Sequence, residues 1–157
     1  MEPKRIGSQT HTTSLVLPYK KTKGKEAVEI YNKTGRTARE WQELLIYDSM
    51  AYDDEGLWVH STYGYAVPRR NGKTEDVIMR ILWGLKNGEK IIYTSHLIST
   101  SHSVWETVTY LLDSMDIKYA SVKAKGQENI RLLDENDKPY KLDNMINFRT
   151  RSNNGGL

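Results

Sequence analysis

The clearest pattern in the sequence is a stripe of apolar residues at helical spacing between residues 73 and 87. The stripe falls at positions i, i+1, i+4, i+5 and i+8, and consists of Val77, Ile78, Ile81, Leu82 and Leu85. Residues at this spacing share one face of an α-helix. Because Asn87-Gly88 provides a typical helix stop, the pattern predicts a helix that ends there.

Two further apolar stripes predict helices on either side of this one. The first is short, covers about residues 38–50, and follows Thr37-x-x-Glu40, which matches a capping box. The second extends to Met115 and opens with the cap-rich run Ser99-Thr100-Ser101. Their apolar positions are Trp41, Leu44, Leu45 and Tyr47 in the first, and Val104, Trp105, Val108, Leu111, Leu112 and Met115 in the second.

The segments between these helices have the composition of strands. Residues 57–67 are rich in Trp, Val, Tyr and Thr, and residues 91–94 are a short apolar run. We therefore expect a strand that ends near Val67 and a second strand after the helix of residues 73–87. Strand, helix, strand, helix is the order of an α/β sheet with parallel strands and crossover helices.

The two ends of the chain have a different texture. Residues 1–36 carry basic residues and one apolar run, Leu15–Tyr19, and we interpret them as an N-terminal arm that packs on the following residues 37–157. Short β-like pieces at about 117–123, 129–133 and 145–149 predict a β-hairpin appendage. The last residues, 152–157, have a loop composition.

Composition narrows the class of protein without naming a function. A chain of 157 residues with 38% hydrophobic and 27% charged residues is typical of one globular domain. The absence of cysteine excludes disulfides and thiolate metal sites, and a net charge of +3 permits contact with nucleic acid without indicating it. Because no apolar signal region and no run of 18 apolar residues occurs, we expect neither secretion by a standard signal nor a membrane span.

The strongest chemical signal lies between the predicted strand and the helix of residues 73–87. There the sequence Val67-Pro68-Arg69-Arg70-Asn71-Gly72-Lys73-Thr74 matches the phosphate-binding loop G-x-x-x-x-G-K-[ST], except that valine replaces the first glycine. Such a loop directs backbone N–H groups at phosphate oxygens, next to the positive end of the helix dipole. We expect a nucleotide-binding loop formed by Pro68, Arg69, Arg70, Asn71, Gly72, Lys73 and Thr74.

Within this loop, individual side chains have distinct expected roles. Lys73 would contact the β- and γ-phosphates, and the Thr74 hydroxyl would coordinate Mg²⁺. Arg69 and Arg70 are either solvated surface charges or, for at least one of them, a group that stabilises transition-state charge as an arginine finger does.

These motifs, with several others, resemble one known family. The order and spacing are similar to those of the large terminase subunit of tailed bacteriophages, across nearly the whole chain. The motifs that carry the resemblance are Arg5–Thr10, Leu17–Tyr19, Trp41-Gln42, Gly56–Val59, Val67–Thr74, Gly88-Glu89, Thr94–His96, Thr100–His102, Gly126–Glu128 and Phe148–Ser152.

The resemblance implies a fold, a cofactor and partners. In that family the N-terminal domain is a P-loop ATPase of the additional-strand type, which uses ATP and Mg²⁺ to drive double-stranded DNA into a procapsid, and a separate nuclease domain cuts the DNA. It implies contacts with the small terminase subunit and the portal protein, in the cytoplasm of the bacterial host. By resemblance Gln42 would contact the adenine edge, although a helix-surface role is the alternative. His96 and His102 are expected to be polar residues of a loop and a helix start.

The sequence also departs from the family. The family continues into an apolar strand ending in Asp-Glu, the Walker B acids, and this sequence contains neither that strand nor the nuclease domain, so we expect an incomplete P-loop sheet with an open edge. Asp134-Glu135 after Ile130–Leu133 is a weak substitute, because Asn136–Pro139 reads as a hairpin turn. Asp53–Glu55 is expected to be a solvated helix stop.

Two functions of different class remain open from the sequence. The first is a fragment of the packaging ATPase that binds ATP but hydrolyses it negligibly, with Walker B and the nuclease absent or supplied by a separate chain. The second is an inactive binding module that occupies DNA, portal or small-subunit surfaces. An unrelated small P-loop kinase would need acidic metal ligands and an acceptor site that the sequence does not reveal.

Overall fold

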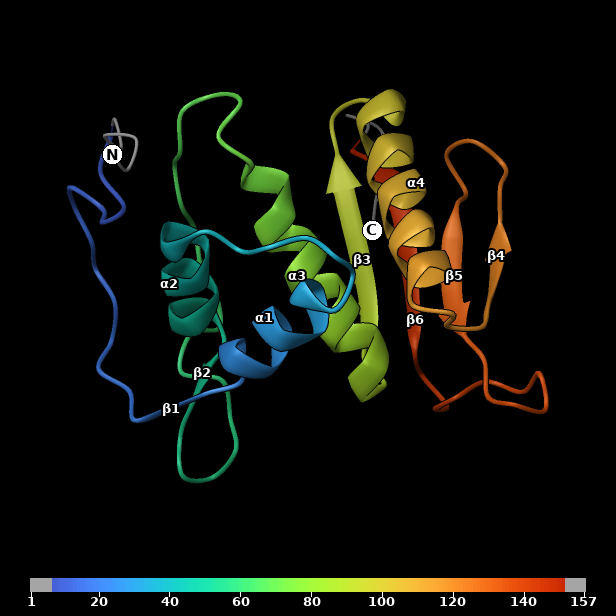
Figure 1. The fold of residues 1–157 in the computed structure, drawn as a ribbon, viewed down its shortest axis with the longest axis horizontal. Coiled ribbons are helices and arrows are strands. Elements are labelled where there is room, and N and C mark those ends of the chain that lie inside the picture. The colour runs from blue at the N-terminus through green and yellow to red at the C-terminus, as the bar shows by residue number, and fades with distance from the viewer. Residues whose placement is uncertain (1–6, 152–157) are drawn as a thin grey trace.

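The computed structural model describes residues 7–151, which form a mixed α/β fold with four helices and two sheets (Figure 1). The predicted loop at residues 152–157 and the first six residues of the predicted arm lie outside this range. The elements, in chain order, are β1 (Lys21–Thr22), α1 (Gly24–Asn32), α2 (Glu40–Ser49), β2 (Ala51–Tyr52), α3 (Lys73–Asn87), β3 (Lys90–Ser95), α4 (Ile98–Ser114), β4 (Tyr119–Val122), β5 (Asn129–Leu132) and β6 (Met145–Thr150).

The larger sheet has the strand order β3-β6-β5-β4. β3 and β6 are parallel, with Ile91 opposite Ile146 and Tyr93 opposite Phe148. β5 pairs antiparallel with both β6 and β4. The strand predicted at residues 91–94 is confirmed as part of β3, but its parallel partner is β6, a segment that the sequence analysis assigned to the appendage. The predicted β-like pieces form β4, β5 and β6, and they extend the main sheet instead of forming a separate appendage.

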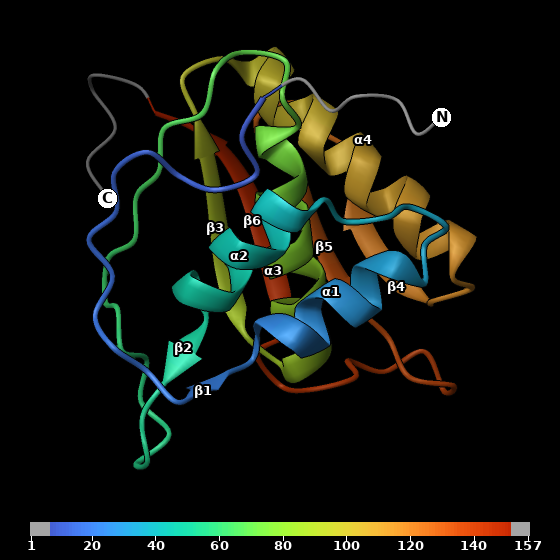
Figure 2. The same cartoon turned by 60° about the vertical axis from the view of Figure 1, so that its left-hand side comes forward.

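Helix α3 is the centre of the packing. It lies against the sheet and beside α4, while α1 and α2 pack on its other side (Figure 2). Seven of its apolar or small side chains and Asp76 are buried. The predicted bounds of this helix are confirmed, and Gly88 ends it with a φ of 85°, a left-handed conformation that glycine adopts readily.

The expected strand at residues 57–67 is wrong. This segment has no strand, and its backbone contact with β2 is an isolated bridge between Trp58 and Tyr52. It lines a cavity together with Ile91, Ile92 and Tyr93 of β3. A residue type that favours strands forms one only where a neighbouring backbone is within hydrogen-bonding distance.

The N-terminal arm is more structured than the sequence analysis expected. Residues 24–32 form α1, whose Ala27, Val28 and Tyr31 are buried at helical spacing. Gly24 lies directly against α2, because a Cβ atom there would come within 2.7 Å of the Ile46 carbonyl oxygen. This part of the arm therefore belongs to the same hydrophobic core as α3.

The start of α2 also differs from the expected capping box. The helix begins at Glu40, and Thr37 is not its cap. Instead the side-chain oxygen of Gln42 accepts a hydrogen bond of 2.9 Å from the Arg39 backbone N–H. Among residues 7–151, no helix is long and apolar enough to cross a membrane.

Candidate functional site

The loop of residues 67–72 leads into α3 at the carboxyl end of β3 (Figures 1 and 2). Two of its residues have left-handed backbone conformations, Arg70 with a φ of 65° and Gly72 with a φ of 83°. The Asn71 side-chain amide donates hydrogen bonds of 3.2 Å to the carbonyl oxygens of Pro68 and Arg69. The loop is thus a tight, internally bonded turn.

The predicted phosphate-contacting side chains are accessible. Lys73 and Thr74 form the first turn of α3 and are exposed, as are Arg69 and Arg70. No side chain caps this end of the 15-residue helix within the described part of the chain. An uncapped helix N-terminus with exposed Lys and Thr side chains has the groups that bind a phosphate anion.

Gln42 connects α2 to the end of this loop. Its side-chain Nε2 donates a hydrogen bond of 2.9 Å to the Gly72 carbonyl oxygen, and the residue is only 3% exposed. A Cβ atom on residue 72 would lie 3.2 Å from that nitrogen. The structure therefore places Gln42 beneath the loop as a positioning residue, and its contact with adenine stays a prediction.

A charged cluster from the arm holds the first turn of α3. Arg36 donates a hydrogen bond of 2.7 Å to Glu75 Oε2, and the Tyr31 hydroxyl donates to the same oxygen. Burial, followed by the bond to Glu75, raises the pKa of Tyr31 to about 12. Because Arg36 balances the charge of Glu75, this carboxylate adds little repulsion toward an anion bound at the neighbouring loop.

The turn after β5, which carries Asp134-Glu135, lies at the opposite end of the sheet from the loop, because β5 runs antiparallel to β6 and β6 runs parallel to β3 (Figure 1). In this turn, Asp134 Oδ1 accepts backbone hydrogen bonds from Asn136, at 2.8 Å, and Lys138, at 2.9 Å. The expected hairpin turn is confirmed. Among the described residues, no group of three or more His, Asp or Glu side chains could hold a metal ion, and the role of Thr74 as a Mg²⁺ ligand stays a prediction.

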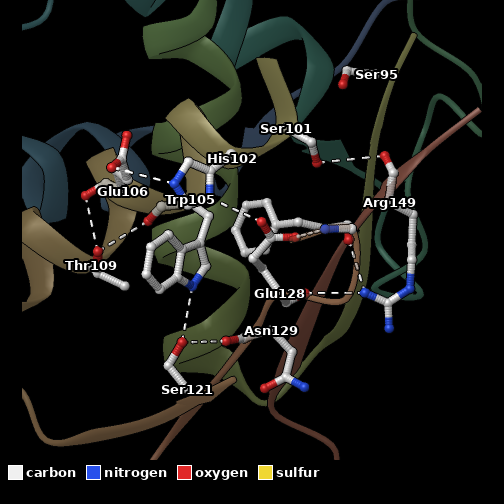
Figure 3. A network of polar contacts seen from close by, with 12 residues as sticks. Ser95, Ser101, His102, Trp105, Glu106, Thr109, Ser121, Glu128, Asn129 and Arg149 are labelled. Carbon is white, nitrogen blue, oxygen red and sulfur yellow. Dashed lines mark hydrogen bonds and ion pairs between the residues drawn. The ribbon is translucent and has the colours of Figure 1, made fainter. Parts of the chain in front are cut away.

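A second polar network joins α4 to the hairpin, and the sequence analysis did not find it (Figure 3). His102 Nδ1 lies 2.9 Å from Oε1 of Glu128, a fully buried residue whose Oε2 accepts a 2.7 Å hydrogen bond from the Gly126 N–H. Burial raises the pKa of the Glu128 carboxyl, but backbone hydrogen bonds and the hydrogen bond with His102 outweigh burial and lower the pKa overall. His102 is thus held in place by Glu128, whereas His96 lies exposed in the turn after β3.

Trp105 and Arg149 extend this network to both sides. Trp105 Nε1 donates to Ser121 Oγ at 2.9 Å, and Ser121 Oγ donates to the Asn129 carbonyl at 2.6 Å. Arg149 Nη1 donates to the Glu128 carbonyl at 3.1 Å. The hydrogen bonds from His102 and Trp105 of α4 to Glu128 and Ser121 fix the hairpin against α4.

Asp76 is the other polar residue that the sequence analysis missed. It is 3% exposed, and no described residue hydrogen-bonds either of its carboxyl oxygens. Burial, followed by the charge of Glu75, raises its pKa from 3.8 to about 7. Helical periodicity could have placed Asp76 on a buried face, because it lies three positions before Met79 and seven positions before Trp83, which are both buried.

No protein-family model, curated protein or solved structure matches this chain. The description of the candidate site therefore rests on the residues and contacts of this chain alone. What the structure shows is a tight loop that enters the uncapped N-terminus of α3 in a mixed α/β fold.

We predict that Asp76 makes stability depend on pH. Since its pKa is higher in the folded chain than in the unfolded chain, the folded chain binds the proton more tightly, and the free energy of unfolding falls as pH rises from about 4 to about 7. In Asp76→Asn, this fall in the free energy of unfolding should be smaller by on the order of 2–4 kcal/mol, at about 1.4 kcal/mol per pKa unit. Urea unfolding at pH 4.5 and pH 8 measures the change.

Asp143→Asn is the matched control, because Asp143 is exposed. It should retain the pH dependence of the original chain. Equal pH dependence in the Asp76→Asn variant and the original chain would contradict the assignment of Asp76 as a buried, unpaired carboxyl.

Proposed function

We propose that residues 67–74 bind the phosphates of ATP with Mg²⁺, and that the chain is the nucleotide-binding part of a P-loop ATPase of the terminase large-subunit type. The observation that carries this proposal is the loop itself. A turn with the Gly-Lys-Thr sequence enters an uncapped helix at the carboxyl end of a parallel strand. Ligands of open α/β sheets bind at that edge.

Each loop residue has a role in this proposal. Lys73 contacts the β- and γ-phosphates as a mobile point charge, while Thr74 coordinates Mg²⁺ together with phosphate oxygens and water. The exposed guanidinium groups of Arg69 and Arg70 lie in the same turn, where one of them stabilises charge on the transferring phosphoryl group. Gln42 and the Arg36–Glu75 ion pair hold the turn in place.

The wider motor is part of the same proposal. Movement of double-stranded DNA, contacts with the small terminase subunit and the portal protein, and location in the bacterial host cytoplasm follow from the resemblance of motifs to terminases. Within this proposal, Walker B and the nuclease belong to a downstream or separate segment.

A binding role with little turnover is the form of this function that the site favours. Hydrolysis needs a carboxylate that positions water and holds Mg²⁺ near the γ-phosphate. Asp134 and Glu135 lie at the other end of the sheet, and Glu75 is engaged by Arg36 and Tyr31. The chain on its own is therefore proposed to bind ATP and to release phosphate only at background rate.

We predict that the chain binds MgATP and that Lys73→Ala weakens binding at least about tenfold. The loss corresponds to one charge-assisted contact of about 1.5–3 kcal/mol. Isothermal titration calorimetry measures it, with the exposed residue Lys125 changed to alanine as the matched control. Steady Mg²⁺-dependent phosphate release that disappears in both Lys73→Ala and Glu135→Gln would contradict the inactive form of the proposal.

We also predict that Gln42→Ala weakens the binding of ATP and GTP by similar factors of about three to ten. The reason is that Nε2 of Gln42 donates to the Gly72 carbonyl, a bond of about 1 kcal/mol that positions the loop for either nucleotide. Titrations of both nucleotides with the variant provide the test. A loss confined to ATP would instead assign Gln42 to the adenine edge.

A further inference from the structure

One face of the larger sheet is covered by helices, and the other face is open. α3 and α4 contact each other and pack on the covered face, where Ile130, Ile146 and Phe148 are buried (Figures 1 and 2). Because successive side chains of a strand point to opposite faces, the alternate residues form the open face. They are residues 90, 92 and 94, 120 and 122, 129 and 131, and 145, 147 and 149, and none of them is fully buried.

The open face is rich in hydrogen-bond donors and lacks acidic side chains. It carries three cations, Lys90, Arg131 and Arg149, and two amides, Asn129 and Asn147. None of the strand residues that form it is Asp or Glu. The face is therefore positively charged over the strands that the structure describes.

The oxygen atoms of the two amides are already occupied. Asn129 Oδ1 accepts a hydrogen bond of 3.3 Å from the Val122 N–H, and Asn147 Oδ1 accepts one of 3.1 Å from Arg149 Nη2. The two asparagines lie opposite each other on β5 and β6. What each amide still offers to a partner is its NH₂ group, which only donates.

Arg149 is held in place by neutral acceptors. Its Nη1 donates to the carbonyl oxygens of Glu128, at 3.1 Å, and Phe148, at 2.8 Å, and its Nη2 donates to Asn147. A guanidinium has five N–H donors, so these three bonds leave donors unused. No carboxylate neutralises its charge among the ion pairs of the described residues.

The other two cations of the open face also lack a carboxylate partner in the described part of the chain. The half-buried Arg131 has one acceptor there, the sulfur atom of Met145, at 3.7 Å from Nη2. A thioether is a weak acceptor and carries no charge. Lys90 is exposed and forms no ion pair with a described residue.

The spacing of the three cations suits a partner with a series of negative charges. Lys90 and Arg131 lie in one row on either side of Met145, so their Cα atoms are about 10 Å apart. Arg149 lies four residues further along β6 than Met145, at a distance of about 13 Å. Phosphates recur along a nucleic-acid backbone, and Arg, Lys and Asn side chains are typical phosphate and sugar contacts.

The uncharged residues of the open face favour a duplex over other polyanions. Unpaired bases bind by stacking on aromatic side chains, and this face has none. A protein interface has a contiguous apolar core, whereas Ile92 and Val122 lie at opposite edges of this sheet with the two asparagines between them. A duplex presents its phosphates outward and needs neither feature.

We propose that the open face binds the sugar-phosphate backbone of a nucleic-acid duplex. Lys90, Arg131 and Arg149 contact phosphates, and the NH₂ groups of Asn129 and Asn147 donate to phosphate or sugar oxygens. Contacts of this kind position a protein on a duplex without reading its sequence. The inference goes beyond ATP binding at residues 67–74, and the charges of the face carry it independently of the resemblance to terminases.

The first experiment titrates the full chain into a fluorescein-labelled DNA duplex of arbitrary sequence and measures anisotropy between about 50 and 200 mM salt. Three phosphate contacts predict that the logarithm of the association constant falls with the logarithm of salt concentration with a slope of about 3. Lys90→Ala should reduce this slope by about one and weaken binding at low salt. Absence of saturable binding, or an unchanged slope in Lys90→Ala, would overturn the proposal.

Two further comparisons separate phosphate contact from a structural role. Arg131→Gln should also reduce the slope by about one, and Arg131→Lys should restore it, because a phosphate contact needs the charge. Lys25→Ala is the matched control, since Lys25 is an exposed lysine of α1, on the helical side of the molecule. It removes the same net charge and should leave the slope unchanged. Equal effects of Lys25→Ala and Lys90→Ala would mean that net charge alone attracts the duplex, and the proposal would be wrong.

Competition with other polyanions tests the choice of partner. Single-stranded DNA and polyglutamate, each at the same concentration of negative charge, should displace the labelled duplex at least about tenfold less effectively than unlabelled duplex does. Equal or stronger displacement by the single strand would assign the face to unpaired nucleic acid. Equal displacement by polyglutamate would assign it to acidic polypeptides. Either result would overturn the proposal.

A MgATP titration of Lys90→Ala separates this inference from the proposed function. Lys90 begins β3, whereas residues 67–74 lie at the carboxyl end of that strand, so the variant should bind MgATP as the original chain does. A chain that binds the duplex but not MgATP would overturn the proposed function and leave this inference in place. A chain that binds MgATP but not the duplex would overturn this inference alone.

Discussion

The position of α3 is the constraint on which the rest of the structure depends. Its inner face is buried against the sheet and α4, and its outer face is buried against α1 and α2. α1 is bonded to it near both ends, through Trp83 Nε1 donating to Glu26 at 3.0 Å and through Tyr31 donating to Glu75. A helix held on both sides presents its N-terminus, and thus residues 67–74, in a fixed direction.

Two different features limit the negative charge beside the loop of residues 67–74. Two acidic residues follow Lys73 and Thr74 directly, and an unbalanced carboxylate there would repel a bound phosphate. Glu75 is balanced by Arg36, whereas Asp76 is buried, and its burial raises its pKa to about 7. The positive character of the helix end is therefore preserved although the first turn is acidic.

The sequence predicts the structure of a segment where that structure depends on residues close to it in the chain, and fails where it depends on distant ones. The stripe of α3 and the turn at Asp134 depend on nearby residues, and both are confirmed. Residues 57–67 are of strand-forming types, but a cavity lies between this segment and β3. The composition of a segment does not show whether a partner strand lies beside it. The Glu128–His102 pair joins positions 26 residues apart, and only the fold brings them together.

The most direct test of the account is an NMR titration of the ¹⁵N-labelled chain with Mg²⁺ and a non-hydrolysable ATP analogue. The account predicts that the largest amide shifts occur at Gly72, Lys73 and Thr74, where the N–H groups of the helix end meet the phosphates. Shifts should be small at residues 134–138, at the other end of the sheet. Saturable binding that leaves residues 69–74 unchanged and shifts another surface would contradict the assignment of this loop as the nucleotide site.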